Sequence, residues 1–237
     1  MAYQNKNLKY IDAEAYDQRG ECSILEKYVL GLWQPFLKNK IFELSAGKVV
    51  ADLGCGTCEY AQAAKNAEKI YAIDTSEIML KICRVKLNDL KQTEIIKDSV
   101  LKVNLPPLDL VITIGIWEYI NPGDLYVKLK TMTNRGSKVV AVFPNIYNDL
   151  NWMRSAVKMK KTMPTGKQVA LRPGYIKKLF KQDFLLIESA SFGNVSFIPK
   201  PIQFLALPVW KFCDWLWAPF QKFFPLGVNV YYLFERK

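Results

Sequence analysis

The sequence contains no histidine among its 237 residues. This absence excludes Ser–His and Cys–His catalytic pairs and all zinc sites that use histidine. The five cysteines are odd in number and scattered, which is typical of a reducing compartment rather than of a secreted disulfide framework. Cys55 and Cys58 have C-x-x-C spacing, but no second pair accompanies them, so redox chemistry is not favoured and we expect no bound metal.

We expect neither a secretion signal nor a membrane-spanning run. Residues 1–20 are polar throughout and have no apolar core of the kind that a signal peptide needs. Residues 201–225 hold eight aromatic side chains, but prolines and charges interrupt them, and a span needs about 20 apolar residues. We therefore expect a cytoplasmic protein, with peripheral contact to a membrane as an option.

Acidic residues are scarce in the C-terminal third. Residues 1–150 carry 19 Lys and Arg against 18 Asp and Glu, whereas residues 151–237 carry 14 against 4. A net charge of +10 in that third suggests an anionic partner, which would be a membrane surface, a nucleic acid or an acidic substrate. A solubilising surface around an apolar segment is the alternative explanation.

Apolar runs and helix-like segments alternate along the chain, which predicts an α/β fold with a doubly wound, mostly parallel sheet. Seven strands are expected, at residues 48–53, 69–74, 93–99, 108–115, 136–143, 184–192 and 228–234. Helices are expected at residues 23–39, 59–67, 76–90, 122–132 and 173–182. Ser76 should cap the third of these helices, with Ile78, Ile82 and Val85 facing inward.

Two glycines follow the first strand, and an acid ends the second. Gly54 and Gly56 allow the backbone to turn sharply and to approach a ligand, and Asp74, 22 positions beyond Asp52, suits a ribose diol. Glu59 stands where a dinucleotide-binding loop has its third glycine, which argues against NAD and FAD. An acid before the glycines suits a cationic ligand instead, and S-adenosylmethionine has an ammonium, a sulfonium and no phosphate.

The stretches "VVADLGCGTCEYA", "IYAIDTSEIML", "IIKDSV", "LDLVITIGIWEYI" and "GSKVVAVFPN" resemble the successive motifs of class I S-adenosylmethionine-dependent methyltransferases. The resemblance covers roughly residues 45–193, with "VNVYYLFERK" as the final, antiparallel strand of a Rossmann-like methyltransferase fold. It implies a single domain over residues 1–237. Its parts are an N-terminal lid and helix (1–44), a donor-binding half (45–143), a basic insertion (144–171) and an aromatic-rich insertion (194–226).

The resemblance also implies which residues bind the methyl donor. Asp52 would lie near the ammonium, Asp74 would hold the ribose hydroxyls, and Asp98 would meet the adenine. The full set implied is Tyr16, Arg19, Asp52, Gly54, Cys55, Gly56, Asp74, Thr75, Met79, Asp98, Ser99 and Ile114. Two positions depart from the family pattern. Thr75 replaces an apolar residue, so Ile78 or Met79 would stack on the adenine, and Asp183 replaces a glycine in a turn.

The acceptor side offers fewer signals. Glu118 and Tyr119 follow the fourth strand and are the catalytic candidates, with Trp117, Asn145 and Tyr147 as substrate-binding candidates. Each of these residues also fits a packing or loop-capping role. The tetrapeptide "GIWE" replaces the N/D-P-P-Y/F pattern of enzymes that methylate planar exocyclic amines, so O-methylation is favoured over N-methylation.

The aromatic-rich insertion favours a small or lipid-like, lipophilic acceptor. Trp and Lys interleave in "VWKFCDWLW", which is typical of a surface that is apolar on one side and wet or anionic on the other. A dimer contact and plain core are the alternatives for this insertion. An RNA methyltransferase is an alternative function, although no RNA-binding module is recognisable and nucleic acid is a less favoured partner. A non-catalytic binding protein on a methyltransferase scaffold is another.

Overall fold

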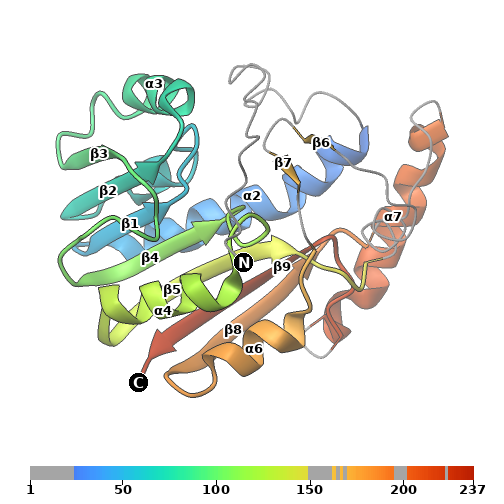
Figure 1. Ribbon diagram of the computed structural model, residues 1–237. Helices are drawn as coiled ribbons and strands as arrows, with labels where there is room; N and C mark the ends of the chain where they lie inside the picture. The colour runs from blue at the N-terminus through green and yellow to red at the C-terminus, as the bar shows by residue number, and fades with distance from the viewer. Residues whose placement is uncertain (1–23, 149–161, 164–165, 168–169, 195–201, 222–223) are drawn as a thin grey trace.

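The computed structural model describes residues 24–148, 162–163, 166–167, 170–194, 202–221 and 224–237. A twisted sheet forms the centre of the molecule, and helices cover both of its faces (Figure 1). Its seven strands, in chain order, are β1 (Val49–Leu53), β2 (Lys69–Asp74), β3 (Thr93–Lys97), β4 (Leu108–Ile114), β5 (Thr133–Pro144), β8 (Phe184–Phe192) and β9 (Asn229–Arg236). The short β6 (Thr162–Met163) and β7 (Gly166–Lys167) form a separate antiparallel pair.

The strand order in the sheet is β3-β2-β1-β4-β5-β9-β8. Strands β1 to β5 run parallel, and β9 lies antiparallel between β5 and β8. The predicted mostly parallel sheet with an antiparallel last strand is therefore confirmed. The order reverses between β1 and β4, so a ligand crevice is expected at the carboxyl ends of these strands.

The helices lie in two groups that bury two hydrophobic cores. The helical elements are α2 (Ile24–Ser45), η2 (Ala61–Ala64), α3 (Glu77–Lys86), α4 (Pro122–Met132), α6 (Pro173–Phe180), α7 (Gln203–Trp217) and η4 (Ala218–Phe220). One core contains residues of α2, η2, α3 and α7, and the other contains residues of α4 and α6. The near-continuous apolar strands β1 and β4 contribute to both cores, as strands covered on both faces should.

The predicted helices are confirmed with two corrections. α4 spans the predicted residues, and Ser76 caps α3 because its Oγ accepts a hydrogen bond from the Met79 N–H at 3.4 Å. The predicted inward face of α3 is wrong, since Val85 is 78% exposed and Met79, Leu80 and Cys83 face the core instead. The helix expected at residues 59–67 is reduced to the four residues of η2, because a tight turn occupies the residues after Gly56.

The aromatic-rich insertion forms α7, which packs against α2. The Tyr28 hydroxyl donates to Asp214 Oδ2 at 2.6 Å, and the Tyr28 and Trp210 rings stack with centroids 6.3 Å apart. Asp214 thereby links α7 to α2 through its carboxylate. No helix in the described part of the chain has the length and apolarity that a membrane crossing requires.

Candidate functional site

A left-handed glycine turn follows β1. Gly54 and Gly56 have φ values of +74° and +54°, a region that residues with a Cβ rarely adopt. A Cβ on Gly54 would also lie 2.9 Å from Cδ1 of Ile116. The Gly54 and Cys55 N–H groups both donate to the carbonyl of Ile73 on β2, at 2.8 and 2.9 Å. The turn is thus fixed to the neighbouring strand by backbone bonds, and the positive φ is the main reason that position 54 needs glycine.

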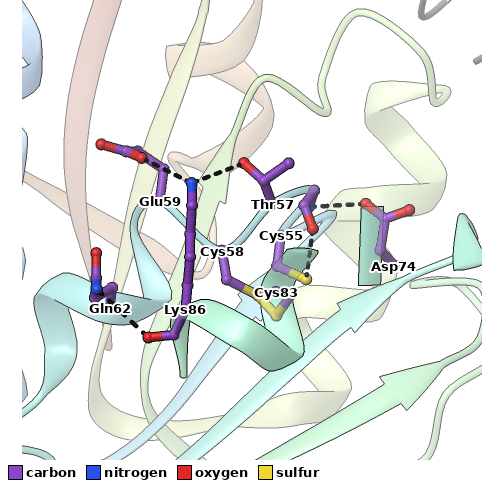
Figure 2. The surroundings of a disulfide bond; sticks show 9 residues. Cys55, Thr57, Cys58, Glu59, Gln62, Asp74, Cys83 and Lys86 are labelled. Atoms are coloured by element: carbon purple, nitrogen blue, oxygen red, sulfur yellow. Dashed lines mark hydrogen bonds and ion pairs between the residues drawn. A yellow bond between two sulfur atoms is a disulfide. The ribbon is translucent and has the colours of Figure 1, made fainter. Parts of the chain in front are cut away.

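Asp74, at the end of β2, joins the glycine turn to the start of α3. Its Oδ2 accepts the Gly56 N–H at 2.9 Å, which is the dashed line that ends at Asp74 in Figure 2. Its Oδ1 accepts the Ser76 N–H at 2.8 Å. Burial raises the pKa of Asp74, and the backbone N–H groups of Ser76 and Gly56 oppose that rise. Each carboxylate oxygen has two lone pairs, so Asp74 can still accept two further hydrogen bonds from a ligand.

Asp52 lies beside this turn and is 2% exposed. Its Oδ2 has no hydrogen-bond partner among the described residues. Burial raises the pKa of Asp52 to about 7, the Ala61 backbone N–H lowers it, and the charge of Asp74 raises it further. Among the described residues, neither Asp52 nor Asp74 forms an ion pair with a lysine or arginine. We name Asp52, Gly54, Gly56 and Asp74 the glycine-turn site, and its two carboxyl groups favour a cationic ligand.

Three of the other residues predicted around this site lie at the carboxyl ends of β3 and β4. Asp98 follows β3, and its Oδ1 accepts the Ser99 N–H at 2.7 Å, while its own N–H donates to the Asp74 carbonyl at 3.2 Å. The backbone therefore brings Asp98 and Ser99 next to Asp74. Ile114 is buried at the end of β4 and is followed by the exposed Gly115, whose φ is +69°.

The remaining predicted donor residues have mixed positions. Met79 lies on the buried face of α3, whereas Ile78 next to it and Thr75 before the helix are exposed. Cys55 is buried in the glycine turn. Tyr16 and Arg19 lie outside the described residues.

Glu118, the predicted catalytic acid, is buried four residues beyond β4. Burial raises its pKa to about 7, and its own backbone N–H lowers it in part. Tyr119 next to it is partly exposed, and its N–H donates to the Ile116 carbonyl at 3.0 Å. An acid whose pKa lies near neutrality is suited to accept a proton from a ligand.

Two of the predicted substrate-binding residues are structural in their contacts. Trp117 lies in the core, where its indole N–H donates to Thr113 Oγ1 at 2.9 Å and its ring contacts Phe143 and Phe180. The prediction that Trp117 lines an open pocket therefore needs correction. The sequence suggested a pocket wall because Trp117 lies in the loop after β4, whereas its ring packs in the core and its indole N–H is bonded back to Thr113 of β4.

Asn145 likewise ties two loops together. Its Nδ2 donates to the carbonyls of Pro225 and Gly227 at 2.7 and 3.0 Å, and its Oδ1 accepts the Tyr147 N–H at 3.0 Å. These bonds occupy both ends of the amide, which corrects the prediction that Asn145 contacts substrate. Tyr147 is more than half exposed and remains accessible. Asn148, which the sequence reasoning missed, adds a bond to the Leu226 carbonyl at 2.9 Å.

The sequence reasoning also missed a disulfide between Cys58 and Cys83, next to the glycine turn. The sequence had suggested a reducing compartment without a disulfide framework, and this single bond between the two cysteines was not predicted. Their spacing of 25 residues gives no signal in the sequence, because only the fold brings α3 over the turn.

Comparisons with known proteins identify a matching family model and solved structures of similar fold. The family model described as "Methyltransferase domain" matches residues 50–135. A comparison with curated proteins found no match. The magnesium protoporphyrin IX methyltransferase of Synechocystis PCC 6803, solved with S-adenosylhomocysteine, has a similar structure at a TM-score of 0.65 and 13% identity, over 96% of each chain.

Two further solved structures are similar over nearly their whole length. A methyltransferase of Thermotoga maritima described as a possible histamine N-methyltransferase has a TM-score of 0.64 at 12% identity, covering 98% of this chain and 100% of that one. The N-methyltransferase NodS of Bradyrhizobium japonicum WM9 has a TM-score of 0.60 at 10% identity, covering 95% and 99%. At these identities the likeness shows a shared fold.

Proposed function

Because this chain has a methyltransferase domain on the class I, Rossmann-like fold, we propose that it binds S-adenosylmethionine in the glycine-turn site and methylates a small, lipophilic acceptor. The observation that carries the proposal is a buried carboxyl group, Asp52, and a partly buried one, Asp74, beside a left-handed glycine turn. Asp52 has a buried oxygen without a hydrogen-bond partner among the described residues, and an ammonium would supply the missing donor. The residues present therefore fit this cationic donor.

Each residue has a separate task in donor binding. Asp74 accepts the two ribose hydroxyls through the lone pairs that the Gly56 and Ser76 N–H groups leave over. The glycine turn lets the methionine part approach the backbone without a Cβ in the way. Asp98, held beside Asp74, meets the adenine. When bound, the donor supplies a methyl carbon activated by a sulfonium.

Glu118 is our candidate for the general base. An acceptor hydroxyl must lose its proton as the new O–CH₃ bond forms, and a base whose pKa lies near 7 can take that proton at neutral pH. Tyr119 would orient the acceptor, and Tyr147, which is accessible, would contact it. A base at Glu118 favours O-methylation over N-methylation. A hydroxyl needs a base to remove its proton, whereas an uncharged amine can attack through its lone pair without one.

The outer face of α7 supports a lipophilic acceptor and contact with an anionic membrane. Trp215 is 71% exposed. Each of the other large apolar side chains of this face is more than half exposed, and these are Phe204, Leu205, Val209, Phe212 and Leu216. Soluble proteins rarely leave such a patch uncovered. Asn145 and Asn148 bind the carbonyls of residues 225–227, so the segment after α7 is fixed to the loop after β5. An acceptor taken from a membrane at α7 would thus enter near the acceptor side.

The first experiment measures donor binding by calorimetry with S-adenosylhomocysteine, with NADH as the control ligand. Binding of S-adenosylhomocysteine alone supports the proposal, whereas binding of NADH alone would contradict it. Donor carrying a labelled methyl group is then incubated with the protein and a lipid extract, and labelled products are identified by mass spectrometry. Glu118→Gln should lower product formation by about 10²-fold or more without changing donor affinity.

The second experiment measures sedimentation with vesicles. Wild-type protein should bind vesicles that contain phosphatidylglycerol, and binding should fall as salt rises. Phe212→Ser with Trp215→Ser should weaken this binding, whereas Tyr175→Ser, which removes a half-exposed aromatic ring of α6, should not. Tight RNA binding without vesicle binding would favour the RNA-methyltransferase alternative, and conversion of a dimer to monomers by the double variant would identify α7 as a subunit contact.

A further inference from the structure

Three cysteine side chains lie together under the glycine turn. The sulfur atoms of Cys55, Cys58 and Cys83 are all within 4.8 Å of one another, and all three residues are buried. Cys58 and Cys83 form a disulfide, with Cys55 beside it (Figure 2). This disulfide links the residue that ends the glycine turn to the middle of α3.

Cys58 has a backbone conformation that is unfavourable for a residue with a Cβ. Its φ is +64°, and it is the only non-glycine residue with a positive φ in the described part of the chain. Its N–H donates to the Cys55 carbonyl at 2.8 Å, and its carbonyl accepts the Gln62 N–H at 3.1 Å. Because a left-handed residue with a Cβ persists only where its surroundings hold it, the disulfide is one of the constraints on this turn.

The disulfide and Asp74 connect the same two segments. Asp74 accepts N–H groups from Gly56 in the turn and from Ser76 at the start of α3, while Cys58 and Cys83 join the turn to α3 covalently. Opening the disulfide would leave Cys58 free to relax toward a negative φ. That change would move the turn whose N–H groups and glycines form the glycine-turn site.

A weaker polar connection would remain after the disulfide opens. Lys86 of α3 has its Nζ 3.4 Å from Glu59 Oε2 and 3.5 Å from Thr57 Oγ1 (Figure 2). Lys38 of α2 pairs with the same Glu59. These contacts keep the turn near α3, so we expect loosening of the turn rather than unfolding.

We propose that Cys58 and Cys83 form a redox-modification site, at which a dithiol reductant opens the disulfide and weakens binding of the methyl donor. The reductant, a protein dithiol or a small dithiol, gives two electrons and two protons. The Cys58–Cys83 bond breaks, two thiols form, and the reductant becomes a disulfide. The consequence for the donor rests on the proposed function, because the site that changes is the glycine-turn site.

Access to this site depends on opening of the turn. Cys58 and Cys83 are fully buried, and Cys55 is 7% exposed, so a reductant reaches the disulfide only when the turn moves. Burial, together with the charges of Asp52 and Asp74, raises the pKa of the Cys55 thiol, which keeps it protonated and makes exchange with its neighbour slow. A ligand that closes the turn should therefore protect the disulfide, and by linkage the disulfide should favour that ligand.

The experiment measures the Kd of S-adenosylhomocysteine by calorimetry on full-length oxidised protein and on protein reduced with dithiothreitol. Free thiols are counted in each sample by alkylation and mass spectrometry. Reduction should release two thiols and raise the Kd by roughly 3- to 30-fold, since only part of the reduced population holds the turn correctly. Cys58→Ser with Cys83→Ser should give the weaker Kd in both conditions. Cys213→Ser removes a thiol of α7 and should behave as wild type.

Two further readouts test the cause. Cys58→Gly with Cys83→Ser should bind more tightly than the double serine variant, because glycine accepts a positive φ without strain. S-adenosylhomocysteine should slow release of the two thiols. If the glycine variant binds no more tightly, or if the ligand does not slow thiol release, then the glycine turn does not couple the disulfide to donor binding.

The outcomes separate this inference from the proposed function. An equal Kd in both redox states would overturn the inference and leave donor binding intact. Absence of donor binding in both states would overturn the proposed function and this inference with it. Uptake of one Zn²⁺ per reduced chain, lost in Cys55→Ser, would identify a thiolate metal site and also overturn the redox proposal.

Discussion

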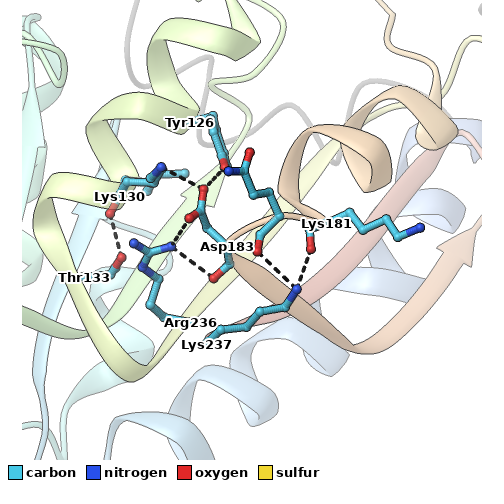
Figure 3. Close-up of polar contacts among 9 residues, drawn as sticks. Tyr126, Lys130, Thr133, Lys181, Asp183, Arg236 and Lys237 are labelled. Atoms are coloured by element: carbon cyan, nitrogen blue, oxygen red, sulfur yellow. Dashed lines mark hydrogen bonds and ion pairs between the residues drawn. The ribbon is translucent and has the colours of Figure 1, made fainter.

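Asp183 and the pair Asp52 and Asp74 are carboxyl groups in opposite electrostatic surroundings. Asp183, between α6 and β8, pairs with Lys130 Nζ at 2.8 Å and Arg236 Nη1 at 3.1 Å, and it accepts the Tyr126 hydroxyl (Figure 3). We name these four residues the ion-pair cluster. The hydrogen bond from Lys130, followed by that from Tyr126, holds the pKa of Asp183 well below its usual range.

The glycine-turn site shows the reverse. Its acids face backbone N–H groups and each other, and burial raises the pKa values of both Asp52 and Asp74. In the ion-pair cluster the protein supplies its own positive charge, so the carboxylate is satisfied by the fold. In the glycine-turn site the described residues supply none, and a cationic ligand would stabilise the ionised acids. The contrast distinguishes an acid that stabilises the fold from acids that are suited to bind a ligand.

Among the changes that test this contrast between the two sites, the largest effect is expected from Asp74→Ala. Loss of a charged hydrogen-bond partner costs about 1.5–3 kcal/mol, so the Kd of S-adenosylhomocysteine should rise roughly ten- to a hundredfold. Calorimetry measures this change, and Asp183→Asn serves as the matched control because its carboxylate lies in the ion-pair cluster. Equal affinity losses in the two variants would erase the distinction between the two sites.

The next effect is the pH dependence of stability that Asp52 causes. Between about pH 4, its usual range, and pH 7, folded Asp52 keeps a proton that the unfolded chain has released. The unfolded state then binds fewer protons, so this group lowers the stability of the free protein as pH rises. Asn cannot titrate, and the Tm of Asp52→Asn should therefore exceed that of wild type by a margin that grows from pH 5 to pH 8.

Thermal unfolding at several pH values checks this margin, and Asp124→Asn, at an exposed position of α4, corrects for general effects of removing an acid. S-adenosylhomocysteine should reduce the margin at pH 8, because its ammonium would pair with ionised Asp52. A margin that shrinks with rising pH would show that a cation of the protein already neutralises Asp52.

The glycine-turn site could be predicted from the sequence because local signals define it. Gly54 and Gly56 need special backbone angles, and Asp74 ends a strand of clear apolar pattern, so order along the chain was enough. The parallel strands followed from the same alternation. The buried face of α3 could not be predicted, because apolar residues occur on two adjacent faces of this helix. Val85 belongs to the predicted face, and Met79 and Cys83 belong to the face that is buried.

Features with distant partners also escaped prediction. Asp183 was expected to affect only a turn, yet its partners come from α4 and from the last strand, more than 50 residues away on either side. Asn145 was expected in a substrate pocket, whereas its partners are carbonyls about 80 residues later. In both cases the residue type indicated a polar contact. The partner could not be predicted, because the fold brings it close from a distant part of the chain.

The smallest effect is expected from Asp183→Asn. Partly exposed ion pairs contribute little to stability, so the Tm should fall by only about 1–3 °C at neutral pH even though three side chains lose a charged partner. The folded pKa of Asp183 is depressed, so its stabilisation is present above the unfolded value near 4 and is lost as pH falls toward the folded pKa. The Tm difference between variant and wild type should therefore shrink below about pH 4. In Asp183→Asn the variant is the less stable protein, whereas in Asp52→Asn the variant is the more stable one.

Thermal unfolding from pH 3 to pH 8 measures the Tm difference for Asp183→Asn, and calorimetry at pH 7 should give an unchanged Kd for S-adenosylhomocysteine. A weakened Kd would mean that the ion-pair cluster is coupled to the glycine-turn site across the sheet, and the two groups of acids would then have to be treated as one system.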